Sequence, residues 1–170
     1  MKSAETQSAR PVVEVTAAVE ADLAPALALL AANDLPSADV ADHFEHFVIA
    51  RDGAWLVGLA GMEVHGDTAL LRSVCVADGV RGTGLGRRLC DEMEGRAAAR
   101  GIRDLYLLTT TAQAFFASRD FDVIDRAEAP EAIRQTAEFR SLCPSSAICM
   151  RKRFRSAPDV IGRVTSEPEP

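Results

Sequence analysis

The chain lacks both a strongly basic character and any apolar run long enough to cross a membrane. Its 170 residues carry 19 Lys plus Arg against 25 Asp plus Glu, which gives a formal net charge of -6. Nucleic acids and anionic membranes attract cationic surfaces, so this balance argues against either as the main partner. A bilayer-spanning helix needs about 20 consecutive apolar residues, and the polar N-terminal segment lacks the apolar core of a signal peptide. We therefore expect a cytoplasmic protein.

Cysteine and histidine are also scarce. The four cysteines show no CxxC spacing and are too few for a secreted disulfide scaffold, so reduced thiols are expected. The three histidines, His43, His46 and His65, stand in no metal-ligand pattern. The sequence thus predicts no metal site and favours surface or loop positions for the histidines.

The length fits one domain with a single core, and 48% hydrophobic residues are enough to build it. Residues 1–11 are polar, and residues 155–170 combine prolines with polar neighbours, so both ends are expected to be flexible tails. The domain is expected over residues 12–154, and no internal repeat is present.

Hydrophobic periodicity predicts an α/β order of elements in this domain. Turn signals at residues 52–53 and 65–67 predict three successive antiparallel strands. The clearest helix begins at Leu85, where apolar residues follow the helical period until Gly101 ends it. Strands are expected over residues 12–15, 47–51, 55–64, 69–76, 104–109, 121–124 and 147–152, and further helices over 20–32, from about 37–39 and over 111–118.

A glycine-rich segment separates the strand at 69–76 from the helix that begins at Leu85. Glycines let backbone N–H groups approach a phosphate, and a helix N-terminus adds unpaired donors. Arg81, Arg87 and Arg88 supply the cationic charge that the chain as a whole lacks. The dinucleotide fingerprint fails because Arg87 stands where its third glycine would be, and the P-loop ending is missing. The segment therefore predicts an anion site, with a simple tight turn as the alternative.

At Arg81, Gly84 and Gly86 the sequence resembles the acyl-CoA motif of the GCN5-related N-acetyltransferase (GNAT) superfamily. The resemblance implies the α/β GNAT fold, a central mixed, mostly antiparallel sheet that is splayed in the middle and flanked by about four helices. It also implies acetyl-CoA as cosubstrate, no metal, and a bulge in the strand at 69–76. By the same resemblance the coenzyme would contact Val74, Val76, Arg81, Gly82, Thr83, Gly84, Leu85, Gly86, Arg87 and Phe116.

Within the superfamily, several segments resemble the acetyltransferases encoded beside arsenic-resistance genes (ArsN-like). This resemblance implies acetyl transfer to the α-amino group of a small amino-acid-like substrate, such as arsinothricin or phosphinothricin. The alternative is a metabolic amino-acid acetyltransferase of the glutamate type, because the strand end at 107–110 resembles those as well. The segments are 35–36, 70–73, 107–112 and 136–144.

Amine acetylation requires a base, because a protonated amine has no lone pair with which to attack. Glu63 is the only carboxylate in an otherwise apolar stretch and is the candidate base, with a solvent-reaching strand end as the alternative. By the family pattern, Val74 N–H would donate to the acetyl oxygen and stabilise the oxyanion. Phe116 stands where many members of the superfamily have a tyrosine that protonates the departing thiolate.

Arg72 is the candidate for substrate binding, because a guanidinium can grip an amino-acid carboxylate with two hydrogen bonds. Its alternation with Leu70 and Val74 predicts that all three share the substrate-facing side of the sheet. The alternative is an ion pair with a neighbouring carboxylate. Further hydroxyl groups in the same cleft are expected from Ser73, Thr109 and Thr110.

A noncatalytic function is the alternative of a different class. The missing tyrosine, together with Cys143 and Cys149, would suit an acyl-CoA-binding or thiol-based arsenic sensor, although thiols in apolar strands are more often buried hydrophobes. The expected partner is a small amine or amino-acid-like molecule, with no nucleic acid and no membrane, and a homodimer stays open.

Overall fold

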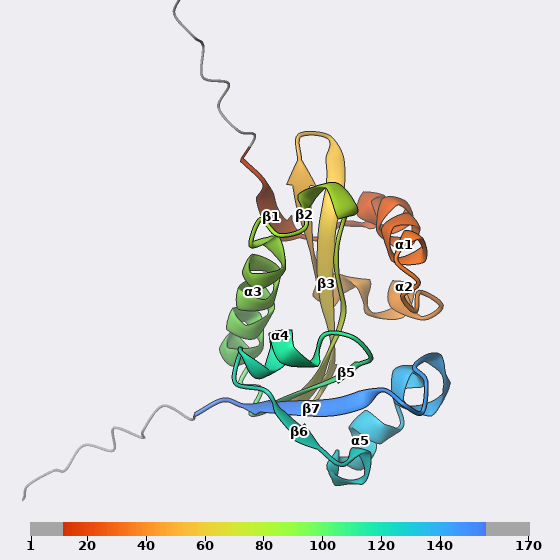
Figure 1. Cartoon of the computed structure of the whole chain (residues 1–170), viewed down its shortest axis with the longest axis vertical. Coiled ribbons are helices and arrows are strands. Elements are labelled where there is room, and N and C mark those ends of the chain that lie inside the picture. Colours follow the sequence, from red (N-terminus) through yellow and green to blue (C-terminus); the bar gives the residue numbers. More distant parts are fainter. Residues whose placement is uncertain (1–11, 156–170) are drawn as a thin grey trace, which may run out of the picture.

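The computed structural model describes residues 12–155 and shows one seven-stranded sheet with helices on both faces (Figure 1). The order across the sheet is β1-β2-β3-β4-β5-β7-β6. All neighbouring strands run antiparallel except β4 and β5, which are parallel. The strands are β1 Glu14–Ala17, β2 Phe47–Asp52, β3 Trp55–His65, β4 Thr68–Val76, β5 Asp104–Thr109, β6 Asp122–Ile124 and β7 Ile148–Arg153.

Five α-helices accompany the sheet within the described residues. Helices α1 and α2 cover one face and α3 covers the other (Figure 1). No helix in the part of the chain that the structure describes is long and apolar enough to cross a membrane. The predicted tails lie outside the described residues, apart from Arg155. The helices are α1 Leu23–Ala32, α2 Val40–His43, α3 Leu85–Ala99, α4 Gln113–Ala117 and α5 Glu131–Arg134, and a π-helical turn follows at Glu138–Leu142.

Alternation along the strands builds a separate core on each face of the sheet. In β2, Val48 and Ala50 belong to the core under α3, whereas Phe47 and Ile49 belong to the core under α1 and α2. A smaller cluster joins Leu70 of β4 to α5. The central strands are therefore buried on both faces, which explains their almost continuous apolar sequences.

Strands β4 and β5 pair over only three residues each, 68–70 and 104–106. Beyond these pairs, β4 continues to Val76 alongside β3, and β5 continues to Thr109 alongside β7. The two halves of the sheet therefore separate at the C-terminal ends of β4 and β5.

The predicted fold class, a mixed and mostly antiparallel sheet splayed in the middle, is confirmed. The predicted order of elements is confirmed as well, including the antiparallel succession of β2, β3 and β4. The sequence did not predict α5 or the π-helical turn. These elements have four and five residues, which is too short for a helical period to emerge from the apolar pattern.

Gly61 in β3 lies where a side chain would overlap the ring of Phe47, which is fully buried in the core under α1 and α2. Because that ring has no space to move into, we expect Gly61→Ala to lower the free energy of unfolding by about 1–3 kcal/mol in urea denaturation. Gly95→Ala is the matched control, because Gly95 lies exposed on α3 with open space around it. It should stabilise the protein by about 0.5–1 kcal/mol, and equal effects of the two substitutions would contradict this argument.

Candidate active site

A cavity of about 520 Å³ opens where β4 and β5 separate. The predicted site residues Arg72, Ser73, Val74, Thr109, Thr110 and Phe116 line it, whereas Glu63, Val76 and the glycine loop at 81–87 do not. The structure thus brings the predicted substrate residues together around one space. The complete lining comprises residues 34–36 after α1, 71–74 of β4, 107–112 from β5 onward, Phe116, 142–144 and Ala147.

Ser73 and Val74 form a bulge at the β4 wall of the cavity. Both residues oppose the single residue Ala60, because the β3–β4 register shifts between the pairs that flank it. Ser73 has a φ of 57°, which is uncommon for a residue other than glycine. The bulge that the family resemblance implied is therefore present, at the residue predicted to meet the acetyl oxygen.

The bulge also corrects the predicted alternation along β4. Leu70 packs with α5 on one face of the sheet, whereas Val74 packs against the core under α3 on the other. The extra residue changes the side on which the following residues lie. The prediction that Leu70, Arg72 and Val74 share one face is therefore wrong, although Arg72 and Val74 both line the cavity.

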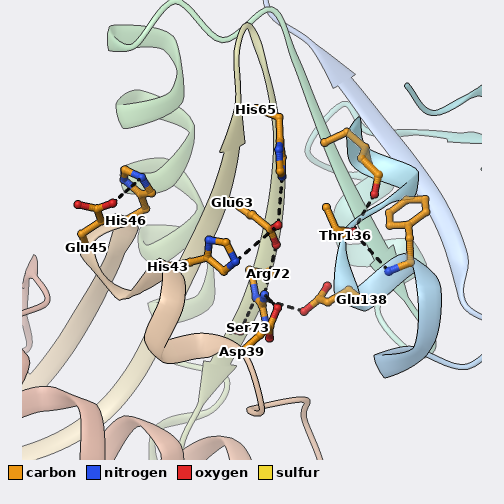
Figure 2. Close-up of polar contacts among 12 residues, drawn as sticks. Asp39, His43, Glu45, His46, Glu63, His65, Arg72, Ser73, Thr136 and Glu138 are labelled. Atoms are coloured by element: carbon orange, nitrogen blue, oxygen red, sulfur yellow. Dashed lines mark hydrogen bonds and ion pairs between the residues drawn. The ribbon is translucent and has the colours of Figure 1, made fainter. Parts of the chain in front are cut away.

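The Arg72 guanidinium is fully buried and contacts three carboxylates (Figure 2). Its Nη1 and Nη2 donate to the two carboxylate oxygens of Asp39 over 2.7 and 2.6 Å. Nη1 also lies 3.4 Å from Glu63 Oε2, and Nε lies 3.3 Å from Glu138 Oε1. One cation therefore faces three potential anions in a buried site.

Asp39 accepts both of the hydrogen bonds that the Arg72 guanidinium was predicted to donate to a substrate carboxylate. The alternative prediction for Arg72, an ion pair with a neighbouring carboxylate, therefore describes the structure, and its role toward substrate stays a prediction. Asp39 stands at the N-cap position of α2 but makes no capping hydrogen bond with its side chain. Its hydrogen bond with Arg72 instead holds the pKa of Asp39 below its usual value.

Glu63 is buried and does not line the cavity. Its Oε1 lies 3.1 Å from His65 Nε2 and 3.5 Å from His43 Nε2, and both rings are half-buried (Figure 2). The alternative of a strand end that reaches solvent is wrong, since Glu63 is only 5% exposed. A base at this position would have to act through an intervening group, and its catalytic role stays a prediction.

Asp39, His43 and Glu63 each place one potential ligand atom within 4.8 Å of the other two. Such donors suit a divalent cation. Both carboxylates, however, already pair with Arg72, and the charge of the guanidinium opposes a second cation at the same point. In this structure the two carboxylates serve as counter-charges of Arg72.

Glu138 is a buried carboxyl group that approaches Arg72 from the π-helical turn. Burial raises its pKa to about 7, the nearby charges of Asp39 and Glu63 act in the same direction, and Arg72 acts against them. A carboxyl group with such a pKa gains and loses a proton near neutral pH, as an acid–base group must.

The glycine loop ends at the N-terminus of α3. Gly82 and Gly84 have φ values of 75° and 85°, which glycine adopts without strain. The helical hydrogen bonds begin with Arg88 N–H donating to Gly84 O over 3.1 Å. The amide groups before Arg88 therefore lack helical partners, and with the positive end of the helix dipole they fit a diphosphate.

The three arginines of the loop differ in their contacts. Arg81 turns back on the loop, since its Nε donates to Val76 O over 3.2 Å and its Nη1 lies 3.1 Å from Asp78. Arg88 donates to a backbone carbonyl before β1. Arg87 is exposed and makes no side-chain hydrogen bond or ion pair with any residue in the range 12–155. Arg87 is therefore the loop arginine that is free to meet an anion.

Phe116 is buried beside the cavity and packs edge-on against Phe115 and Phe121. Its ring has no proton to donate to a thiolate. Cys143 lines the cavity as well, and burial raises its pKa to about 11. Burial has the same effect on Cys149, so both groups are protonated thiols near neutral pH.

Three acidic residues at or near the cavity were not predicted as site residues. Asp39 was placed only at the expected start of a helix, Glu138 lies in a segment without predicted structure, and Asp34 follows α1 and lines the cavity. The available signal was Arg72 itself, because a charged residue in a buried strand needs a partner. The sequence does not say which distant carboxylate supplies it.

The raised pKa of Glu138 gives a test of its burial. Between its ordinary pKa of 4.5 and about 7, the folded state keeps a proton that the unfolded state releases, so stability falls as pH rises. Glu138→Gln removes this loss of stability. We therefore expect the gap in unfolding free energy between this variant and wild type to change by about 2 kcal/mol in favour of the variant from pH 5 to pH 8. Urea denaturation at both pH values measures the gain. Glu131→Gln, an exposed change on α5, should follow wild type, and a gap that does not widen would contradict the burial argument.

Comparison with known proteins finds a family model that matches part of the chain. Residues 43–123 match the family model described as the acetyltransferase (GNAT) domain. No curated protein matches the chain significantly.

Solved structures share the fold over most of the chain. N-acetylglutamate synthase from Neisseria gonorrhoeae, complexed with coenzyme A and N-acetyl-glutamate, has a TM-score of 0.74 at 22% identity, over 85% of this chain and 36% of that one. Rv2747 from Mycobacterium tuberculosis, in complex with CoA, has a TM-score of 0.71 at 19% identity, over 84% and 99%. The ribosomal-protein-S18-alanine N-acetyltransferase from Escherichia coli has a TM-score of 0.67 at 18% identity, over 89% and 99%.

At these identities the likeness is one of fold, and this chain spans about a third of the length of the synthase, 36%. The family match and the fold nevertheless agree on the region that holds the bulge and the glycine loop. The match to the GNAT acetyltransferase domain thus covers residues 43–123, within a chain that shares the fold of these solved structures.

Proposed function

We propose that the protein is an acetyl-CoA-dependent N-acetyltransferase that acts on the α-amino group of a small amino-acid-like substrate. The observation that carries this proposal is the cavity at the separation of β4 and β5, which contains the bulge at Val74. The glycine loop supplies the matching anion site at the N-terminus of α3. The GNAT domain match supports the reaction class, and the CoA complexes of proteins with the same fold support the cosubstrate.

In this proposal the acetyl thioester lies beside the bulge, and the amine attacks its carbonyl carbon in a ternary complex. Val74 N–H donates to the developing oxyanion, and one such backbone donor is worth roughly 2.7–4 kcal/mol. Coenzyme A leaves as a thiolate. Phe116 supplies no proton, and a thiol with a pKa of about 8.5 is a tolerable leaving group near neutral pH.

The substrate is proposed to be an amino acid or an analogue of one. Four polar residues, Arg72, Ser73, Thr109 and Thr110, are among those that line the cavity. The ArsN-like resemblance makes arsinothricin or phosphinothricin the first amines to test, with a role in arsenic resistance. Glutamate is the metabolic alternative, favoured by the shared fold with N-acetylglutamate synthase.

The activity is tested by thiol release from acetyl-CoA across a panel of amines, with mass spectrometry of the products. We expect an acetylated α-amine among arsinothricin, phosphinothricin, glutamate and related amino acids. Acetyl-CoA binding without CoA release on any amine would contradict the enzyme and favour the noncatalytic sensor.

The coenzyme site gives a separate prediction. Arg87→Ala should weaken coenzyme A binding by roughly 10-fold in calorimetry, because a free cation beside the loop is lost. Arg100→Ala is the matched control, since Arg100 lies exposed at the opposite end of α3, and its affinity should equal that of wild type. Absence of any heat with the wild-type protein would contradict the proposed cosubstrate.

A further inference from the structure

Two side-chain oxygens lie beside the Nε atom of Arg72 at the cavity wall. Ser73 Oγ is 3.5 Å from Nε, and Glu138 Oε1 is 3.3 Å from the same atom. Ser73 lines the cavity at the bulge, whereas Glu138 does not line it. The two oxygens make no hydrogen bond with each other, so a connection between the cavity and the buried carboxyl group needs one bridging water.

The π-helical turn fixes Glu138 at this place. Cys143 N–H donates to Glu138 O over 3.0 Å and closes the turn, and Leu142 and Cys143 then line the cavity. Turns of this kind are frequent at functional sites. The charged and titratable groups around Glu138 are Arg72 of β4, Asp39 before α2, Glu63 of β3 and Cys143.

We infer that Ser73 and Glu138 form the path by which the attacking amine loses its proton, an inference that rests on the function proposed above. As the amine nitrogen bonds to the thioester carbon, its proton passes to Ser73 Oγ, and the hydroxyl proton of Ser73 passes through a bridging water to the Glu138 carboxylate. The carbon–sulfur bond then breaks, and its electron pair leaves with the sulfur of coenzyme A. The proton on Glu138 returns to the thiolate or to solvent. Ser73 touches the reacting group, and Glu138 is a positioning residue that acts through it.

The pKa of Glu138, raised to about 7 by burial, suits this role, because the group accepts a proton at neutral pH and releases it again. The other carboxylates suit it less well. Both oxygens of Asp39 are held by Arg72, and Glu63 approaches Arg72 at Nη1 rather than at the Nε atom beside which Ser73 lies. Asp34 lies exposed at the cavity and has no buried proton path.

The backbone of Ser73 supports the same inference. Its positive φ favours glycine, and strain held at a residue that lines a site is associated with function. Glycine at this position would relieve the strain but would remove the hydroxyl group. The strained serine is therefore explained if the hydroxyl takes part in the reaction.

The test compares Glu138→Gln and Ser73→Gly in steady-state thiol release with the best amine of the panel. Each variant should lower kcat at pH 7 by about 10- to 100-fold, with the KM for acetyl-CoA within about twofold of wild type. In wild type kcat should fall as pH drops below about 7, because a protonated Glu138 accepts no proton. Glu138→Gln should lose this limb, and Glu138→Asp should retain it at a reduced rate.

The double variant separates a shared path from two independent effects. If the residues act in series, Ser73→Gly combined with Glu138→Gln should be about as slow as the slower single variant. If the fold-decrease in kcat of the double variant equals the product of the two single fold-decreases, the two residues act independently and the proposed path is wrong. Ser73→Gly relieves backbone strain and therefore gives a folded reference if Glu138→Gln is unstable.

Glu63→Gln and Asp34→Asn are the comparison variants, and both should retain an acidic limb of the kcat profile. In Glu63→Gln this limb should shift to lower pH, because the charge of Glu63 raises the pKa of Glu138. Loss of that limb in either control but not in Glu138→Gln would overturn the inference and identify a different base. If wild type acetylates an amine while Glu138→Gln keeps the full pH profile, the proton path is wrong and the proposed function stands. If wild type acetylates no amine, both fall.

Discussion

The early separation of β4 and β5 is the constraint on which the rest of the site depends. The two strands stay together for three residue pairs, and β4 then remains with β3 while β5 remains with β7. The facing edges of β4 and β5 have no strand between them beyond these pairs. Residues 71–74 of β4 and 107–109 of β5 therefore line a cavity. The bulge at Ser73 and Val74 lies within this stretch, so backbone groups face a space that a ligand can enter.

Burying Arg72 beside this opening creates a problem of charge. A guanidinium out of water needs counter-charge, and Asp39, Glu63 and Glu138 supply more negative charge than it can balance. Asp39 takes the two strongest hydrogen bonds, so its pKa falls, whereas Glu138 lies at a longer distance and its pKa rises through burial. One ion cluster therefore holds a permanent ion pair and a carboxyl group that titrates near neutral pH.

The features that suit coenzyme A are mostly backbone features: the bulge in β4, the positive φ values of Gly82 and Gly84, and the open amides at the start of α3. Backbone geometry tolerates many side chains, which is consistent with a shared fold at about 20% identity. Substrate choice depends instead on the side chains around the cavity. The match of residues 43–123 to the GNAT domain model therefore supports a reaction class, and the amine is left to be found by experiment.

The sequence by itself determined the order of strands and helices and the glycine loop, because periodicity, turn residues and glycine spacing are local properties of the chain. It also proposed Arg72, Ser73, Thr109 and Thr110 as substrate residues, and these four residues do line one cavity. Only the tertiary structure decided that Asp39 and Glu138 meet Arg72, that Glu63 lies outside the cavity, and that the bulge turns Val74 away from Leu70. Asp39 and Arg72 are 33 positions apart, and Glu138 is still farther along the chain, so no local pattern encodes these contacts. Burial and packing between distant elements fixed them.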